Sequence, residues 1–374
     1  MFKNITVMSL AVFALISCGK SMQEGTDATV AVESEPSVVL VPVDSIGVEQ
    51  GDSNYVMGGV ESVAFGPDGN IAVLDCGRSC TRIYSREGEY LRRIGNRGNG
   101  PGELQSVTFL AISEDGHVYM SGTGSSEYGV HAFDYFTGRW LESEHTFVPP
   151  SCLEGSEENS YVRKTIGFEM KDGEPWLLIS IARHAVGLEE PIQTYYEESV
   201  RFDLSDDVGM LELDWYGYDI AATADGDVYI APRSTEEALV IAFDSIGQEK
   251  YRFELDLEPV ARTEDEMEME RNILRAKAIA SDENPAGLEP NPYKPLIRGL
   301  EVDGSGNLWV LQGGPSIPTF NVFDSSGEFL YTARVAGNPP DGSTWRFYMD
   351  ENGILAYAED PASGFQKIYM LEMQ

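Results

Sequence analysis

One pattern of apolar and polar positions recurs along the chain. In each copy an apolar strand leads into a tight turn that contains Gly, and a second strand with alternating apolar positions follows. The turn and second strand read PDGNIAVLD (67–75), EDGHVYMSG (114–122), KDGEPWLLIS (171–180), ADGDVYIAP (224–232), GSGNLWVLQ (304–312) and ENGILAYAE (351–359). Because Gly adopts the positive φ that a hairpin turn needs, each copy predicts a β-hairpin in which the turn joins a first strand to a second.

The hairpins belong to longer units. Further turns at SREGEY, DYFTGR, DLSDD, DSIGQE and DSSGEF are placed to join a third strand to a fourth. Four short antiparallel strands per unit, repeated at intervals of about 45 to 80 residues, are typical of a β-propeller. The copies predict an all-β, six-bladed β-propeller over residues 38–374, and a seventh blade would need a repeat that is not seen in the sequence.

The two ends of this region predict how the propeller closes. After the last turn there is room for only two more strands, ILAYAED and FQKIYMLEM. The segment VVLVPVDSIGV (38–48) precedes the first unit and belongs to no other. We expect this N-terminal strand to complete the last blade, since a closed ring protects the strand edges.

An insertion over about 259–296 separates the fourth unit from the fifth. Residues 263–280 lack Gly and Pro, begin with Thr263 and acidic side chains, and carry Arg and Lys later, which predicts one helix with Thr263 as its N-cap. A modest apolar stripe is supplied by Met267, Ile273, Leu274 and Ile279. We expect this stripe to pack onto the propeller, and a partner-binding helix is the alternative.

The first residues predict export. Lys3 precedes an apolar run from Ile5 to Ile16, which is too short to span a bilayer, and Ser17-Cys18-Gly19 follows. This arrangement resembles the lipobox of bacterial lipoproteins, which implies a signal peptide over 1–17, lipidation of Cys18 and a place in the bacterial cell envelope, periplasmic or surface-exposed. An ordinary secretory signal with a chance Cys is the alternative. Residues 18–37 are polar and acidic, as expected of a flexible tether, so contact with the membrane would be made only through the lipid.

The charge of the chain excludes one class of partner. Without residues 1–17 the chain has 25 basic and 62 acidic side chains, a formal charge of −37. Nucleic acid is therefore a poor partner, whereas an envelope protein, a peptide or a glycan remains open. An acidic surface that serves only solubility is the simpler interpretation of the charge.

The cysteines permit one short disulfide. Outside the cytoplasm, Cys76 and Cys80 are candidates to close the loop CGRSC, with Cys152 left over or competing for either partner.

The first unit carries a family resemblance. PDGNIAVLD, then Arg82-Ile83-Tyr84, then EGEYLRRIGNRGNGPGEL (87–104), resembles the NHL repeat and its relatives among bacterial six-bladed lipoproteins. The run from Gly95 to Glu103 is its most specific part, and the resemblance weakens outside the first and fifth units. It implies a six-bladed fold and a role in binding a ligand or partner, not a particular activity.

Loop lengths select one face of the predicted disc as the functional surface, because the long connections emerge on the same end of each four-stranded blade. Alignment of the six units on their turns then gives a ring of polar residues at the start of the first strands. This ring comprises Glu61, Thr108, Thr165, Tyr218, Arg298 and Thr344, with Trp345 and Arg97 in adjoining loops. These residues are candidates to bind a ligand at the mouth of the central channel, or they only solvate that channel.

A metal-dependent hydrolase or lyase is the second functional hypothesis. Some six-bladed propellers hold a divalent cation in the channel, and Glu61 faintly resembles the metal-binding Glu of gluconolactonase-like enzymes. Asp219 is the one further candidate ligand nearby, and the four His residues show no three-ligand spacing. The sequence therefore favours a non-catalytic binding protein with no cofactor, and assigns a divalent cation only to the alternative.

Overall fold

The computed structural model describes residues 28–30, 37–124, 127–146, 152–156, 159–171, 173–188, 190–201, 217–280, 288–337, 343–359, 361 and 363–374. The predicted signal peptide, Cys18 and the predicted turn at DLSDD lie outside the described residues.

The described residues form five β-sheets. The first contains β3 (Val60–Phe65), β4 (Ile71–Asp75), β5 (Cys80–Tyr84) and β6 (Tyr90–Ile94). The second contains β7 (Asn96–Arg97), β8 (Glu103–Ile112), β9 (His117–Gly124), β10 (Glu127–Asp134) and β11 (Trp140–Thr146). The third contains β12 (Cys152–Gly155), β13 (Tyr161–Lys171), β14 (Glu174–His184) and β15 (Gln193–Arg201).

The fourth sheet contains β16 (Tyr218–Ala222), β17 (Val228–Pro232), β18 (Leu239–Phe243), β19 (Glu249–Leu255) and β1 (Ala28–Val30). The fifth has eight strands. Its order runs β20 (Ile297–Val302), β21 (Leu308–Gln312), β22 (Thr319–Phe323), β23 (Phe329–Val335), β2 (Val38–Ile46), β26 (Ile368–Met373), β25 (Gly353–Glu359) and β24 (Thr344–Asp350).

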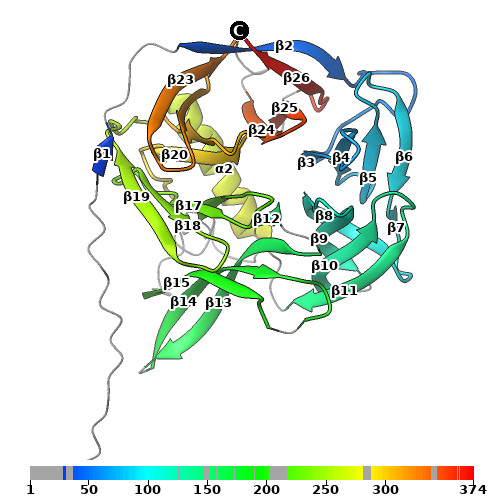
Figure 1. The fold of residues 1–374 in the computed structure, drawn as a ribbon, viewed down its shortest axis with the longest axis horizontal. Helices are drawn as coiled ribbons and strands as arrows, with labels where there is room; N and C mark the ends of the chain where they lie inside the picture. Colours follow the sequence, from blue (N-terminus) through cyan, green and yellow to red (C-terminus); the bar gives the residue numbers. More distant parts are fainter. Residues whose placement is uncertain are drawn as a thin grey trace, which may run out of the picture.

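The innermost strands contact one another in a closed circle. β3 contacts β8, β8 contacts β12, β12 contacts β16, β16 contacts β20, β20 contacts β24, and β24 returns to β3. Figure 1 shows the sheets standing around a common axis, with these strands nearest to it. The described residues are all-β in architecture apart from one helix, and their sheets have a propeller arrangement, as the sequence predicts.

The predicted turn glycines adopt the backbone conformation that their positions require. Positive φ angles occur at Gly69, Gly116, Gly173, Gly226, Gly306 and Gly353. A side chain would be strained at these positions, which explains why the turn signal recurs so clearly along the sequence. Five of these turns join the first two strands of their units.

The third unit departs from the prediction. Its glycine turn joins β13 to β14, the second and third strands of the sheet, because a short first strand, β12, lies within the segment 148–161 that the sequence assigns to a loop. Thr165 therefore lies on β13 and not on the innermost strand. Counting back from the turn therefore gives the wrong strand in this unit. The sequence does not reveal β12, because a four-residue strand flanked by Gly, Ser and Glu shows no alternation of apolar and polar positions.

β2 closes the eight-stranded sheet. It pairs antiparallel with β26 from Leu40 to Ile46, as predicted for the N-terminal strand, and parallel with β23 from Val38 to Leu40. Leu40 is fully buried and packs in the cluster that joins β22 and β23 to β24 and β25. One strand thus links the two halves of the sheet at the rim (Figure 1).

Three residues of the segment 18–37, for which the sequence predicts a tether, form the strand β1. Ala28, Thr29 and Val30 pair parallel with Phe253, Glu254 and Leu255 at the outer edge of the fourth sheet. Val30 also packs against the core between this sheet and β20–β23. An exposed strand edge accepts a β-branched segment readily, so part of the polar leader is bound to the folded body.

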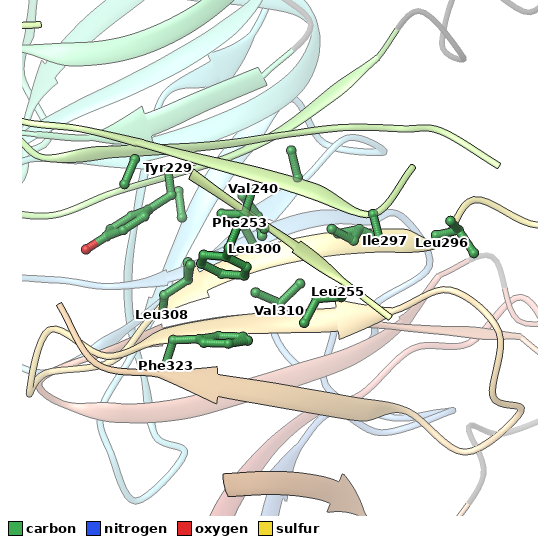
Figure 2. Packing of buried hydrophobic residues seen from close by; sticks show 14 residues of the cluster. Tyr229, Val240, Phe253, Leu255, Leu296, Ile297, Leu300, Leu308, Val310 and Phe323 are labelled. Carbon is green, nitrogen blue, oxygen red and sulfur yellow. The ribbon is translucent and has the colours of Figure 1, made fainter. Parts of the chain in front are cut away.

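Neighbouring sheets pack face to face through apolar clusters. Figure 2 shows the cluster between the fourth sheet and β20–β23, where Phe253 and Phe323 lie with ring centroids 4.4 Å apart. Both rings are buried, and an aromatic pair of this kind contributes about 1 kcal/mol beyond the burial of its area. Such clusters fix the spacing of the innermost strands and hence of the side chains near the axis.

Helix α2 (Glu264–Ala280) forms where the sequence predicts it. Thr263 Oγ1 accepts from the Glu266 N–H at 3.3 Å, and Glu266 Oε2 accepts from the Thr263 N–H at 2.8 Å, which is a capping box. Leu274 and Ala278 are buried against Leu288, whereas Ile273 of the predicted stripe is exposed. Among the described residues, no helix has both the length and the apolar character needed to cross a membrane.

Candidate functional site

β-bulges set the direction of three of the predicted side chains. The ladder register shifts at Glu61 in β3, at Thr108 in β8 and at Arg298 in β20, so the backbone pairing with the second strand skips each of the three residues. A bulge adds one residue to a strand and redirects its side chain. The shared bulge explains why counting back from the turn finds equivalent positions in these three sheets.

Arg298 lies in a mixed-charge environment. Burial lowers the pKa of its guanidinium to about 10, and the positive charge of Arg346 acts in the same direction, against the carboxylates of Glu359 and Asp219. Its Nε is buried and has no hydrogen-bond partner among the described residues. A buried guanidinium donor without an acceptor is costly unless a ligand or water satisfies it.

Arg346 and Glu359 form a two-point ion pair beside Arg298. Nε and Nη2 of Arg346 donate to the two carboxylate oxygens, both at 2.9 Å. The side chains keep 37% and 41% of their surface exposed, although burial shifts the pKa of their neighbour Arg298. Both side chains therefore remain accessible to solvent although they lie beside a largely buried guanidinium group.

A second ion pair stands on the fourth sheet. Arg233 Nη2 donates to Asp219 Oδ1 at 2.8 Å, and its Nε approaches both carboxylate oxygens at 3.2 and 3.3 Å. Asp219 is nearly buried, and β16, which carries it, contacts β20, which carries Arg298. We call Arg298, Arg346, Glu359, Asp219 and Arg233 the axial cluster.

Glu61 and Thr344 adjoin the axial cluster. Tyr357, which pairs with Arg346 across β24 and β25, donates its hydroxyl to the Glu61 carbonyl at 2.5 Å. Thr344 pairs with Glu359 in the same ladder. Two more of the predicted ring residues, Glu61 on β3 and Thr344 on β24, therefore lie on innermost strands beside the axial cluster.

A carboxyl group lies further along β20. Burial raises the pKa of Glu301 well above its usual range, and the carboxylates of Glu154 on β12 and Asp219 add to the rise. Like charges brought together in a buried space favour the neutral acid, which is the direction of this shift. The axis therefore carries cations, carboxylates and a carboxyl group with a raised pKa.

The other predicted residues do not join this cluster. The Tyr218 side chain is buried, and its hydroxyl contacts Glu198 and Tyr196 on the third sheet. Trp345 is 4% exposed and packs edge-on against Tyr369 in the core. Both alternate to the core face of their strands, so they are packing residues and not the walls of a mouth.

Thr108, Thr165 and Arg97 also lie apart from the axial cluster. Thr108 shares a 2.8 Å hydrogen bond with Ser121, and Thr165 sits on β13. Arg97 is exposed on β7 and reaches the Gly77 carbonyl at 3.4 Å.

The predicted disulfide between Cys76 and Cys80 is not formed in the structure. The loop CGRSC is held instead by Asp75, which accepts from Arg78 Nη1 at 2.8 Å and from Arg82 Nη2. Cys80 begins β5 opposite Asp75 with its side chain buried, and burial raises the pKa of its thiol. The side chain of Cys152 is outside the described residues.

Sequence reasoning missed most of the axial cluster. Arg346 lies two residues after Thr344 on the same strand, so strand alternation alone would have placed both on one face. Glu359 is the last residue of β25, and Arg233 directly follows β17, the second strands of their units. Their signal is positional, an ionisable side chain at the end of an apolar second strand.

The metal hypothesis finds little support in the side-chain geometry. Asp219 is neutralised by Arg233, which directs both carboxylate oxygens to a cation of the protein itself. Within the described ranges no group of three or more His, Cys, Asp or Glu residues is arranged to hold a metal ion.

Comparison with known proteins gives the fold alone. No protein-family model matches the chain, and no curated protein matches it in sequence. A solved protein from Bacteroides fragilis that is described as exported aligns with 93% of this chain and all of its own length, with a TM-score of 0.55 and 10% identity. A member of the DUF4221 family from Bacteroides vulgatus aligns with 90% of this chain and 98% of its own, with a TM-score of 0.51 and 9% identity.

Proposed function

We propose that this protein is a non-catalytic, six-bladed binding propeller of the bacterial cell envelope. In this proposal Cys18 carries the lipid anchor and the ligand binds at the axial cluster, on the face with the long loops. The blade count is supported by the closed circle of β3, β8, β12, β16, β20 and β24. The two halves of the eight-stranded sheet then count as separate blades that β2 joins at the rim.

The proposed binding role rests on one observation, the electrostatic environment of Arg298. Its charge is enclosed beside a second guanidinium, and its Nε lacks an acceptor among the described residues. A protein gains no stability from such an arrangement, whereas an anionic ligand group would satisfy both the charge and the donor. Unfavourable electrostatics of this kind cluster at functional sites.

The composition of the axial cluster narrows the ligand. Three guanidinium groups and two carboxylates meet there, and the carboxyl group of Glu301, whose pKa is raised by burial, lies further along β20. A ligand with a carboxylate beside other polar groups fits, because Arg298 pairs with the carboxylate while the two ion pairs supply donors and acceptors around it. A peptide with a free C-terminus, or a glycan or partner protein that presents a carboxylate, meets this description.

Binding of short peptides to the full-length protein in detergent tests the proposal. Triglycine with a free carboxylate is compared with triglycine amide by isothermal titration calorimetry. We expect the acid to bind at least roughly tenfold more tightly than the amide, since the amide cannot form a charged two-point contact with Arg298. The Arg298→Met variant should lose this difference.

The matched control is Arg201→Met, because Arg201 lies in an exposed ion pair with Glu174 on β15. This variant should bind like the unmodified protein. Equal binding of acid and amide, or an undiminished preference in Arg298→Met, would contradict the proposal. Lipidation is tested separately, since Cys18→Ser should abolish incorporation of a labelled fatty acid in bacterial cells.

A further inference from the structure

A hollow lies on the second sheet, apart from the axial cluster. Its volume is about 460 Å³, which is the size of a small-molecule site. The Gly-rich loop 98–102 borders it, and strands β8 to β11 supply the rest of its walls. The side chains that matter below are Glu103, His131, Trp140, Ser143 and His145.

Trp140 provides a flat wall in a fixed orientation. The indole is 38% exposed, and its Nε1 donates to Ser143 Oγ at 3.1 Å. Gly102 packs directly on it, since a Cβ at that position would lie 2.5 Å from the Trp140 Cβ. The loop therefore needs Gly at 102 to approach the tryptophan, and the ring is held in place by the loop on one side and by Ser143 on the other.

His131 presents a buried polar group to the same space. It is 3% exposed, and its Nδ1 lies 2.7 Å from Ser143 Oγ. Its Nε2 has no hydrogen-bond partner among the described residues. Burial lowers the pKa of the imidazole to about 4, so the ring is neutral at pH 7. A Cβ on Gly124 would lie 2.9 Å from its Cε1, so β9 approaches this edge of the ring closely only because position 124 has no side chain.

Glu103 adds an acceptor at the start of β8. Its Oε2 accepts from the Gly100 N–H at 2.9 Å, which holds the glycine loop in place, and the carboxylate has capacity for further hydrogen bonds. Glu142 also borders the hollow, but its carboxylate approaches Gly187 in the loop between β14 and β15. Among the described residues no Lys or Arg lines the hollow, which disfavours phosphates, sulfates and other anions.

We propose that this hollow is a binding site for a neutral saccharide, with a pyranose ring stacked on Trp140 and its hydroxyl groups bonded to Glu103 and to His131 Nε2. A sugar has one apolar face and a rim of hydroxyls that both donate and accept, which matches an aromatic wall beside a carboxylate and a neutral imidazole. A quaternary ammonium ion fits less well, because it makes no hydrogen bond and would leave His131 Nε2 unsatisfied. This site does not depend on the function proposed for the axial cluster.

The test is saturation-transfer NMR with the full-length protein in detergent. The probes are D-glucose, D-galactose, D-mannose and N-acetyl-D-glucosamine, with tetramethylammonium chloride as the cationic comparison. We expect saturation of at least one sugar, with the strongest signal on its ring protons. Trp140→Ala should weaken binding at least roughly tenfold, Glu103→Gln should weaken it severalfold, and Trp140→Phe should retain most of it.

Phe136→Ala is the matched control, because Phe136 is a 57% exposed aromatic residue in the turn that leads to β11. Binding should be unchanged in this variant. Should Trp140→Ala fail to fold, Glu103→Gln decides the matter, since the amide oxygen can still accept from Gly100. The proposal is overturned if none of the four sugars binds, if tetramethylammonium alone binds, or if Phe136→Ala and Trp140→Ala reduce binding equally.

Discussion

Arg298 and Arg346 hold two guanidinium groups on neighbouring innermost strands, and burial together with the charge of Arg346 lowers the pKa of Arg298 to about 10. Glu359 compensates Arg346 directly through two hydrogen bonds, whereas the carboxylates near Arg298 are already engaged with other arginines. The charge of Arg298 is thus compensated less well by the protein's own contacts than the charge of Arg346.

Removing this cation should stabilise the fold. In Arg298→Met the apolar stem is kept and the enclosed charge is lost, so the free energy of unfolding should rise by about 1 kcal/mol after allowance for partial exposure. Urea denaturation followed by tryptophan fluorescence measures the change, with Arg201→Met as the exposed control. A loss of stability in Arg298→Met would show that Arg298 is structural.

The ion pair between Asp75 and Arg82 should matter far more to stability. Both side chains are 2% exposed, and Arg82 also donates to the carbonyls of Asn54 and Val56. Asp75→Asn leaves a buried guanidinium without its counter-ion, so we expect a loss of about 3 kcal/mol in the free energy of unfolding. The corresponding change in an exposed pair, Glu174→Gln beside Arg201, should cost under about 1 kcal/mol. Equal losses in the two variants would contradict this account.

Closure through β2 gives a third prediction. Leu40 is fully buried between the two halves of the eight-stranded sheet, whereas Val43 on the same strand is 49% exposed. Leu40→Ala should lower the free energy of unfolding by about 3 kcal/mol, and Val43→Ala should change it by less than about 0.5 kcal/mol. Chemical denaturation of both variants measures this, and a silent Leu40→Ala would mean that β2 does not hold the sheet together.

The buried histidine predicts a dependence of stability on pH. His131 has a pKa of about 4 in the folded state against about 6.5 when unfolded, so the unfolded chain binds the proton more readily. The stability that it contributes is complete above pH 6.5 and is lost as the pH falls toward 4. Between pH 7 and pH 5 the native protein should lose about 2 kcal/mol more than His131→Gln does. Urea midpoints of both proteins at the two pH values test this, and parallel pH profiles would refute the assignment.

The sequence predicts the hairpins well because their signal is local. A glycine with positive φ at the turn, followed by buried alternate residues, needs no knowledge of distant contacts, and Gly69 and Gly226 show this directly. The pairing of residues 38–48 with the last strands also followed from counting, since that segment had no other unit to complete. The helix was found for the same reason, as Thr263 and Glu266 form its cap within four residues.

The site was harder to predict because it depends on which way a strand faces. Tyr218 belongs to the predicted polar ring and Trp345 was predicted in a loop beside it, yet both turn toward the core and leave the axis to Asp219 and Arg346. β12 was missed because its four residues acquire strand geometry only by pairing with β13 and contacting β8. The direction in which these side chains point depends on strand register, bulges and neighbouring sheets. A short stretch of sequence does not determine any of the three.

The pairing of β1 with β19 has a consequence for how the molecule would sit at a membrane. The first residue of β1 is Ala28, ten residues after Cys18, and a segment of that length reaches at most roughly 35 Å when fully extended. A lipid on Cys18 would therefore attach the propeller to the membrane through a short segment that joins it at the outer edge of the fourth sheet. Attachment there obstructs neither flat side, so molecules diffusing along the bilayer and molecules arriving from the bulk solution would have equal access to the centre.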